Sequence, residues 1–138
     1  MRQITSILLL AVSALLGRSA YAQQQQSFPN CSAAFIDLRM IVNAYTPTGT
    51  CRLQAGATGD LTVQTVELSA TDAKPVSKID FKVAIRDKAT GTLHLFSEEI
   101  YRQIPVQRVL ATCRKGDRIV LLMVDKQYAL PHNEIQVQ

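Results

Sequence analysis

A stretch of strictly alternating apolar and charged residues is the clearest structural signal in the chain. It spans residues 78–86, KIDFKVAIR, and a period of two places its apolar side chains on one face of a strand. Residues 87–91, DKATG, supply turn chemistry, because Asp favours the start of a turn and Gly91 can adopt a positive φ. An apolar return strand follows. The pattern therefore predicts a β-hairpin over residues 78–99.

Further strands are predicted where short apolar runs stand between turn signals. The run 61–69, LTVQTVELS, is rich in β-branched residues, and its alternation slips between Val63 and Val66 as it does at a β-bulge. Residues 119–124, IVLLMV, form a continuous apolar run that indicates a fully buried strand. The remaining predictions are strands at residues 34–44 and 51–53, a loop at residues 71–77, and a last edge strand within residues 128–137 with Ile135 and Val137 facing inward.

One short helix is predicted after Ile104. Apolar residues recur there at helical spacing, at Val106, Val109, Leu110 and Cys113. Pro105 suits the first helical position, and Gly116 suits a C-terminal stop. We expect a helix of two to three turns.

Six to seven short strands with one short helix predict a mainly β fold. The predicted architecture is an antiparallel β-sandwich, immunoglobulin-like in the loose sense. The chain contains no Trp, so a marker of true immunoglobulin domains is missing. The alternative is an α+β fold, in which the helix packs across an open sheet.

The N-terminus predicts export. Arg2 precedes an apolar run at residues 4–16, and Ala20 and Ala22 occupy the small-residue positions of a signal-peptidase site. The apolar run is shorter than the roughly 20 residues that a membrane-spanning helix needs. We therefore expect a signal peptide at residues 1–22, a periplasmic or secreted protein without a membrane span after cleavage, a disordered polar leader at residues 23–30, and a single β-sandwich domain at residues 31–138.

The charge balance argues against nucleic acid as a partner. The whole chain has a formal net charge of +4. Arg2 and Arg18 lie in the predicted signal peptide, so cleavage would leave the mature chain close to neutral. A near-neutral exported domain offers no electrostatic footprint for nucleic acid.

Basic residues cluster only around the predicted helix, where Asp117 is the single acid. The cluster contains Arg102, Arg108, Arg114, Lys115 and Arg118. Such a face could dock an acidic partner, such as an envelope protein, or an anionic envelope component. The alternative is a solvated helix face, with cations near the helix C-terminus where the helix dipole favours them.

Candidate chemistry is sparse. His132 and Glu134 lie close together in sequence and could form a metal or acid–base site, although further metal ligands are not indicated. No GxSxG, HExxH, P-loop or GxGxxG motif occurs. Because no catalytic constellation can be assembled, we expect no enzyme and no cofactor.

The chain has three cysteines, Cys31, Cys51 and Cys113. In an oxidising compartment one disulfide with one thiol left over is the simple expectation. Three pairings are possible, and we favour Cys31–Cys51 because it would clip the N-terminal segment to the following loop. The alternative is that all three are small buried apolar residues.

Residues 81–125 resemble a known family. The runs FKVAIRDKATGTLHLF and VQRVLATCRKGDRIVLLMVD are similar to the C-terminal β-sandwich domain of the periplasmic shaft protein of the gliding-motility/type IX secretion machinery. The short motif of the resemblance is Lys115, Gly116, Asp117 and Ile119. The family's transmembrane helix and preceding domains have no counterpart in this chain. The resemblance implies a sandwich fold and envelope assembly, and it transfers no functional residue.

These observations predict an exported envelope or secreted β-sandwich that acts as a protein-interaction or structural module. It would use exposed sheet edges or the basic region around the helix. One alternative is a small-ligand binder with its pocket between the sheets. A further alternative is a metal-dependent or acid–base hydrolase around His132 and Glu134.

Overall fold

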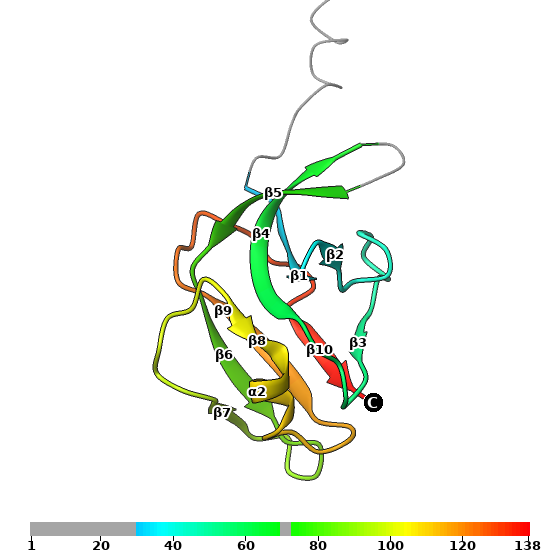
Figure 1. The fold of residues 1–138 in the computed structure, drawn as a ribbon, viewed down its shortest axis with the longest axis vertical. Helices are drawn as coiled ribbons and strands as arrows, with labels where there is room; N and C mark the ends of the chain where they lie inside the picture. The colour runs from blue at the N-terminus through cyan, green and yellow to red at the C-terminus, as the bar shows by residue number, and fades with distance from the viewer. Residues whose placement is uncertain (1–29, 70–72) are drawn as a thin grey trace, which may run out of the picture.

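The computed structural model describes residues 30–69 and 73–138 (Figure 1). The predicted signal peptide and all of the predicted leader except Asn30 lie outside these residues. The described chain forms β1 (Ser32–Ile36), β2 (Arg39–Met40), β3 (Cys51–Leu53), β4 (Asp60–Leu68), β5 (Ala73–Ile79), β6 (Phe81–Arg86), β7 (Leu93–Leu95), β8 (Ile104–Pro105), α2 (Val106–Leu110), β9 (Arg118–Met123) and β10 (Glu134–Val137).

The strands form two sheets, and this arrangement confirms the predicted mainly β, sandwich-like fold with one short helix. The first sheet has the order β2-β1-β4-β5, with β8 also paired to β4. The second sheet has the order β3-β10-β9-β6-β7. Every strand pairing is antiparallel except that of β10 with β3. No helix of the described residues has the length and apolar character needed to cross a membrane.

One hydrophobic core joins the two sheets and the helix. Leu61 and Val63 enter it from β4, Val83 from β6 and Leu121 from β9, and all four are almost fully buried. The buried side of α2 contributes Val109. Burying such side chains contributes roughly 1.5–3 kcal/mol each, so this core is the main source of stability.

The predicted hairpin is present as β6 and β7, with Arg86 opposite Leu93. Asp87 organises the turn, because its Oδ1 accepts hydrogen bonds from the backbone N–H groups of Ala89 (2.7 Å) and Thr90 (3.2 Å). Gly91 has a φ of 72°, as the turn requires. β6 also lies beside β9, in which Ile119, Val120 and Leu121 are buried. The predicted full burial of residues 119–124 is wrong at its end, because Val124 lies beyond β9 and is exposed.

The beginning of the hairpin prediction is wrong. Lys78 and Ile79 belong to β5 of the first sheet, and the chain passes to the second sheet at Asp80. The alternation continues through Asp80 because Ile79 and Phe81 both face the shared core. The predicted loop at residues 71–77 is also wrong from Ala73 onward, because β5 is an edge strand and an edge tolerates Pro75.

The predicted single strand at residues 34–44 is a hairpin. The chain reverses at Asp37 and Leu38, where Asp37 has a φ of 54°, and β2 pairs back on β1. Asp is one of the few residues that adopt this conformation readily. This turn and the break at Asp80 raise the strand count above the six to seven predicted.

Other predictions have mixed outcomes. The bulge in β4 is confirmed by a register shift between Gln64 and Val66. β10 buries Ile135 and Val137 as expected, but it is not an edge strand, since it lies between β3 and β9. α2 is shorter than the predicted two to three turns. Beyond it the backbone hydrogen bonds change to the i→i+3 type, as in the bond from Thr112 N–H to Val109 O at 3.0 Å, so the α-helix ends there.

Candidate functional site

Three arginines stand in one row across the outer face of the second sheet. Arg52 of β3 is in register with Gln136 of β10, Gln136 with Arg118 of β9, and Arg118 with Arg86 of β6. Residues in register on neighbouring strands point to the same face of a sheet. The adjacent row on the opposite face contains Ile135, which is fully buried in the core. The arginines therefore face solvent.

Arg86 and Arg118 are directly opposite each other, an arrangement that repels when both side chains are charged. Glu134 of β10 resolves the repulsion by contacting both. Its Oε1 accepts from Arg86 Nη2 at 3.0 Å and Nε at 3.2 Å, and its Oε2 accepts from Arg118 Nη1 at 3.1 Å. One carboxylate thus holds two guanidinium groups in place.

The protonation of Glu134 follows from these contacts. Burial alone would raise the pKa of Glu134, but hydrogen bonds from Arg86 and Arg118 outweigh it and hold the pKa below its usual value of 4.5. Glu134 is therefore ionised near neutral pH. Both of its oxygens already accept hydrogen bonds from arginine, so it acts in this state as a positioning group for the row.

A shallow pocket of about 460 Å³ lies at the Arg52 end of the row. Arg118, His132 and Glu134 all line this pocket, although the sequence pointed to Arg118 as part of a basic face and to the other two as a metal or acid–base site. The polar groups that converge on it are Arg52, Arg118, His132, Asn133, Glu134 and Gln136.

His132 is held by the loop that crosses between the two sheets. Its Nε2 lies 2.7 Å from the backbone oxygen of Thr46, and its ring contacts Tyr45 edge-on with 5.3 Å between ring centroids. The Thr46 oxygen can only accept, so Nε2 donates and Nδ1 is left unprotonated in the neutral ring. His132 and Glu134 thus share a pocket but are engaged by different partners. Among the described residues no group of three or more His, Cys, Asp or Glu side chains is placed to hold a metal ion.

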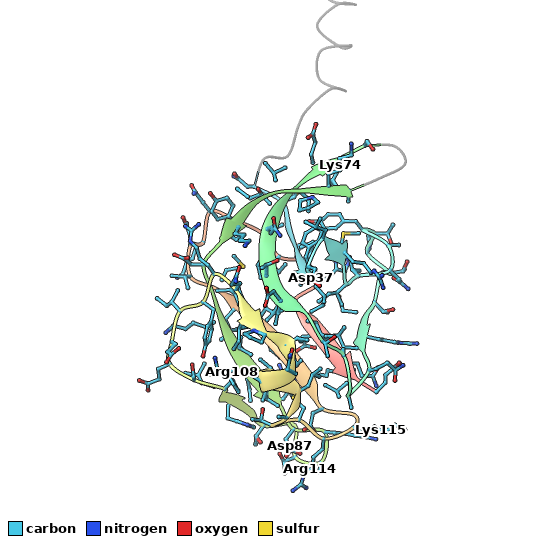
Figure 2. All side chains as sticks on the ribbon, in the orientation of Figure 1. Asp37, Lys74, Asp87, Arg108, Arg114 and Lys115 are labelled. Carbon is cyan, nitrogen blue, oxygen red and sulfur yellow. The ribbon has the colours of Figure 1, made fainter. Side chains whose placement is uncertain are left out.

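The structure divides the predicted basic face into separate parts. Arg102 pairs with Asp80, with Nε to Oδ1 at 3.0 Å, and Arg118 belongs to the arginine row. Arg108 lies on the exposed side of α2, and Arg114 and Lys115 lie in the turn that follows it, where Figure 2 shows them at the lower end of the molecule. We call these last three residues the basic end.

The single acid of the predicted cluster, Asp117, is buried at 7% exposure. Its Oδ2 accepts from the Arg114 backbone N–H at 2.8 Å and its Oδ1 from the Lys88 backbone N–H at 3.0 Å. These two bonds lower the pKa of Asp117 below its usual value. Asp117 therefore organises the chain beneath the basic end and does not offer its carboxylate to a partner.

The predicted Cys31–Cys51 disulfide is absent, and all three thiols are free. The backbone of Cys31 pairs with that of Ala129 in an isolated β-bridge just before β1 of the first sheet. Cys51, in contrast, lies in β3 of the second sheet. Burial raises the pKa of Cys51 to about 11, which makes it an unreactive core thiol. The alternative interpretation of a buried apolar cysteine therefore describes Cys51.

Sequence reasoning missed Arg52 and Arg86 as members of the site. Arg86 was assigned to the charged face of a strand, and Arg52 was placed on a short strand without a role. Their alignment with Arg118 depends on the pairing of strands that are far apart in sequence. The only local sign of a shared surface was the alternation of apolar and polar residues, which predicts that each arginine points away from the core.

Comparison of the chain with protein-family models, curated proteins and solved structures found no match. The resemblance of residues 81–125 to the shaft-protein family stays a prediction. What the site can bind follows from the geometry and charge of its own residues.

Proposed function

We propose that this protein is an exported β-sandwich, periplasmic or secreted, that acts as a protein-interaction module of the cell envelope. The surface that binds is the arginine row, and the partner supplies an acidic segment. The observation that carries this proposal is the alignment of Arg52, Arg118 and Arg86 on one solvent-facing row with Glu134 as their only ion-pair partner in the described chain.

The chemistry of the row supports a carboxylate-bearing partner. A guanidinium presents several N–H donors in a fixed plane and binds carboxylates in a bidentate manner. Arg52 forms no ion pair with any described residue, so its donors are open to a ligand. Arg118 donates to Glu134 through Nη1, and its side chain remains 52% exposed. Three arginines against one glutamate leave a local excess of positive charge.

The row is better prepared for binding than the basic end. Its arginines stand on paired strands, and Glu134 fixes two of them before a partner arrives. Fixed side chains lose less conformational entropy on binding. Arg114 and Lys115, in contrast, extend from a turn and have no described ion-pair partner to orient them.

The test compares a single charge reversal in the arginine row with a double charge reversal at the basic end. The mature protein carrying Arg52→Glu, and separately Arg108→Glu with Arg114→Glu, is used to capture partners from envelope extract and is titrated with a Glu-rich peptide. We expect Arg52→Glu to weaken peptide binding about tenfold or more and to reduce capture, since a rim charge reversal changes association and salt dependence. The basic-end variant should bind as the wild type does. Loss of binding only in the basic-end variant would move the interface there.

A second candidate function is binding of a small anionic ligand. It is favoured by the convergence of polar groups on the pocket of about 460 Å³, a size within the usual range of roughly 300–1,000 Å³ for ligand sites. Succinate is a suitable probe because it carries two carboxylates on a short chain. Saturable succinate binding that Arg52→Glu removes, without any binding of the Glu-rich peptide, would favour this candidate over the interaction module.

A further inference from the structure

A second, larger groove lies next to the arginine row. It has a volume of about 760 Å³ and runs between the β1–β2 hairpin and β3 with the residues after it. β2 and β3 are edge strands of different sheets, and an antiparallel backbone bridge between Val42 and Cys51 links them, so the groove lies where the edges of the two sheets meet. Its apolar lining consists of Ile36, Met40, Ile41, Leu53 and Ala57, which are partly buried and pack on the main core.

Leu38 stands at the rim of this groove with 82% of its surface exposed. The turn that carries it is firmly anchored. The Asp37 backbone N–H donates to Asp60 O at 2.9 Å, and the Asp60 N–H donates to Asp37 Oδ1 at 3.0 Å. Gly59 packs so closely that a Cβ there would lie 2.7 Å from Ile36 Cγ2. The fold thus holds a large apolar side chain in solvent at a fixed position, where it lacks a partner in the described chain.

The charges at the groove complement an acidic ligand. Arg39 and Arg52 both line it, and neither forms an ion pair with a described residue. The single acid of the lining, Asp37, is already used by the Asp60 backbone. Arg52 lines this groove and also the pocket of the arginine row, so the two surfaces are continuous.

We propose that the groove receives the apolar side chains of the acidic partner segment, so that the ligand is an extended peptide with apolar residues followed by acidic ones. This inference rests on the proposed function. Neighbouring strands are about 4.8 Å apart, so Arg86, three strands from Arg52 in the order β3-β10-β9-β6, lies about 14 Å from it along the row. One head group is too short to span the whole row, whereas carboxylates at alternate positions of an extended peptide are about 7 Å apart and can follow it. The geometry therefore favours a peptide over a single-headed amphiphile.

Two capped peptides test the inference, one with leucines followed by glutamates and one with the leucines replaced by serines. We expect the leucine peptide to bind the wild-type protein about tenfold more tightly by calorimetry, because only its side chains bury apolar surface in the groove; tenfold corresponds to about 1.4 kcal/mol. Leu38→Ser and Ala57→Trp should remove most of that preference, because they should weaken binding of the leucine peptide far more than binding of the serine peptide. Val76→Ser, at a position that is 62% exposed on β5 away from the groove lining, is the matched control and should change neither affinity.

The outcomes separate this inference from the proposed function. Equal affinity of the two peptides, with both weakened by Arg52→Glu, would overturn the groove assignment and leave the arginine row standing. A leucine preference that persists when Arg52 and Arg118 are both changed to Glu would overturn the role of the row. Dodecanoate that binds the groove more tightly than the leucine peptide would overturn the peptide as occupant. NMR of the wild-type protein gives a readout that needs no substitution. The methyl resonances of the groove residues Ile36, Met40, Ile41 and Leu53 should shift when the leucine peptide binds, and unchanged resonances with the peptide bound would also overturn the groove assignment.

Discussion

The carboxylate of Asp117 accepts a hydrogen bond from the backbone N–H of Lys88 at 3.0 Å, although the two residues are 29 positions apart in the chain. The same carboxylate accepts from the Arg114 N–H at 2.8 Å, and the Asp117 backbone oxygen accepts from Val137 N–H at 2.9 Å. One buried residue therefore ties together the β6–β7 turn, the turn after α2 and the last strand.

Replacement of Asp117 by Asn should destabilise the fold. Asn offers one carbonyl oxygen where Asp offers two carboxylate oxygens, so one backbone N–H loses its acceptor in a buried place. We expect the free energy of unfolding to fall by about 1–3 kcal/mol, measured by urea denaturation at pH 7. The control is Glu98→Gln, at an exposed position, which should change stability little. Equal stability of the two variants would contradict the role given to Asp117.

The contribution of Asp117 should also depend on pH. Hydrogen bonds from the backbone of Arg114 and Lys88 hold its pKa below the usual 3.8, so the folded protein favours the ionised form more than the unfolded chain does. The stabilisation is complete above the unfolded pKa and is lost as the pH falls through the folded pKa. The stability gap between wild type and Asp117→Asn should therefore be largest near pH 6–7 and shrink as the pH is lowered below about 4. A gap that stays constant from pH 7 to pH 2 would show that the carboxylate charge is not involved.

Glu134→Gln tests how the arginine row is held. Without the carboxylate, Arg86 and Arg118 remain directly opposite each other and repel. Because these side chains are partly exposed and solvent screens their charges, we expect a loss of only about 1 kcal/mol in the free energy of unfolding.

Added salt should make the loss of unfolding free energy in Glu134→Gln smaller, since counterions screen the repulsion between the two arginines. Adding Arg86→Gln to Glu134→Gln should restore part of the stability, which a double-mutant cycle measures. Strictly additive effects of the two substitutions would argue against coupling through the row.

Two glycines separate the effect of backbone conformation from that of crowding. Gly91 and Gly116 both have a positive φ, 72° and 96°. A Cβ at Gly91 would meet nothing within 4 Å, whereas a Cβ at Gly116 would lie 2.3 Å from Cδ of Lys88. Both Gly→Ala variants should lose about 1 kcal/mol for the left-handed conformation. Because Lys88 is exposed and the flexible end of its side chain can move aside, Gly116→Ala should lose little more than Gly91→Ala in thermal unfolding. A much larger loss at Gly116 that Lys88→Ala relieves would show that the Lys88 side chain is held in place.

The sequence predicts the parts of the fold that are set by neighbouring residues. The turn at Asp87, the bulge after Gln64 and the strand β9 with its buried middle each follow from short local patterns. The turn at Asp37 escapes detection because it contains no Gly, Pro or Asn, and because its exposed residue is Leu38. A two-residue reversal of this kind leaves the alternation of apolar positions almost undisturbed.

The candidate site could be predicted only in fragments. Arg118, His132 and Glu134 were identified from the residues themselves. Their meeting with Arg52, and the engagement of Arg102 by Asp80, depend on the order and register of distant strands. No local pattern encodes that register, so charges that look free in the sequence are paired in the fold.

The passage of the chain through Asp80 has a mechanical consequence. β5 and β6 belong to different sheets, yet only Asp80 separates them. The Asp80 carboxylate forms an ion pair with Arg102. Tension applied to β5, at the edge of the first sheet, therefore passes along the covalent backbone directly into β6 of the second sheet, without an intervening loop to absorb it. A pull on either sheet therefore loads both sheets at once.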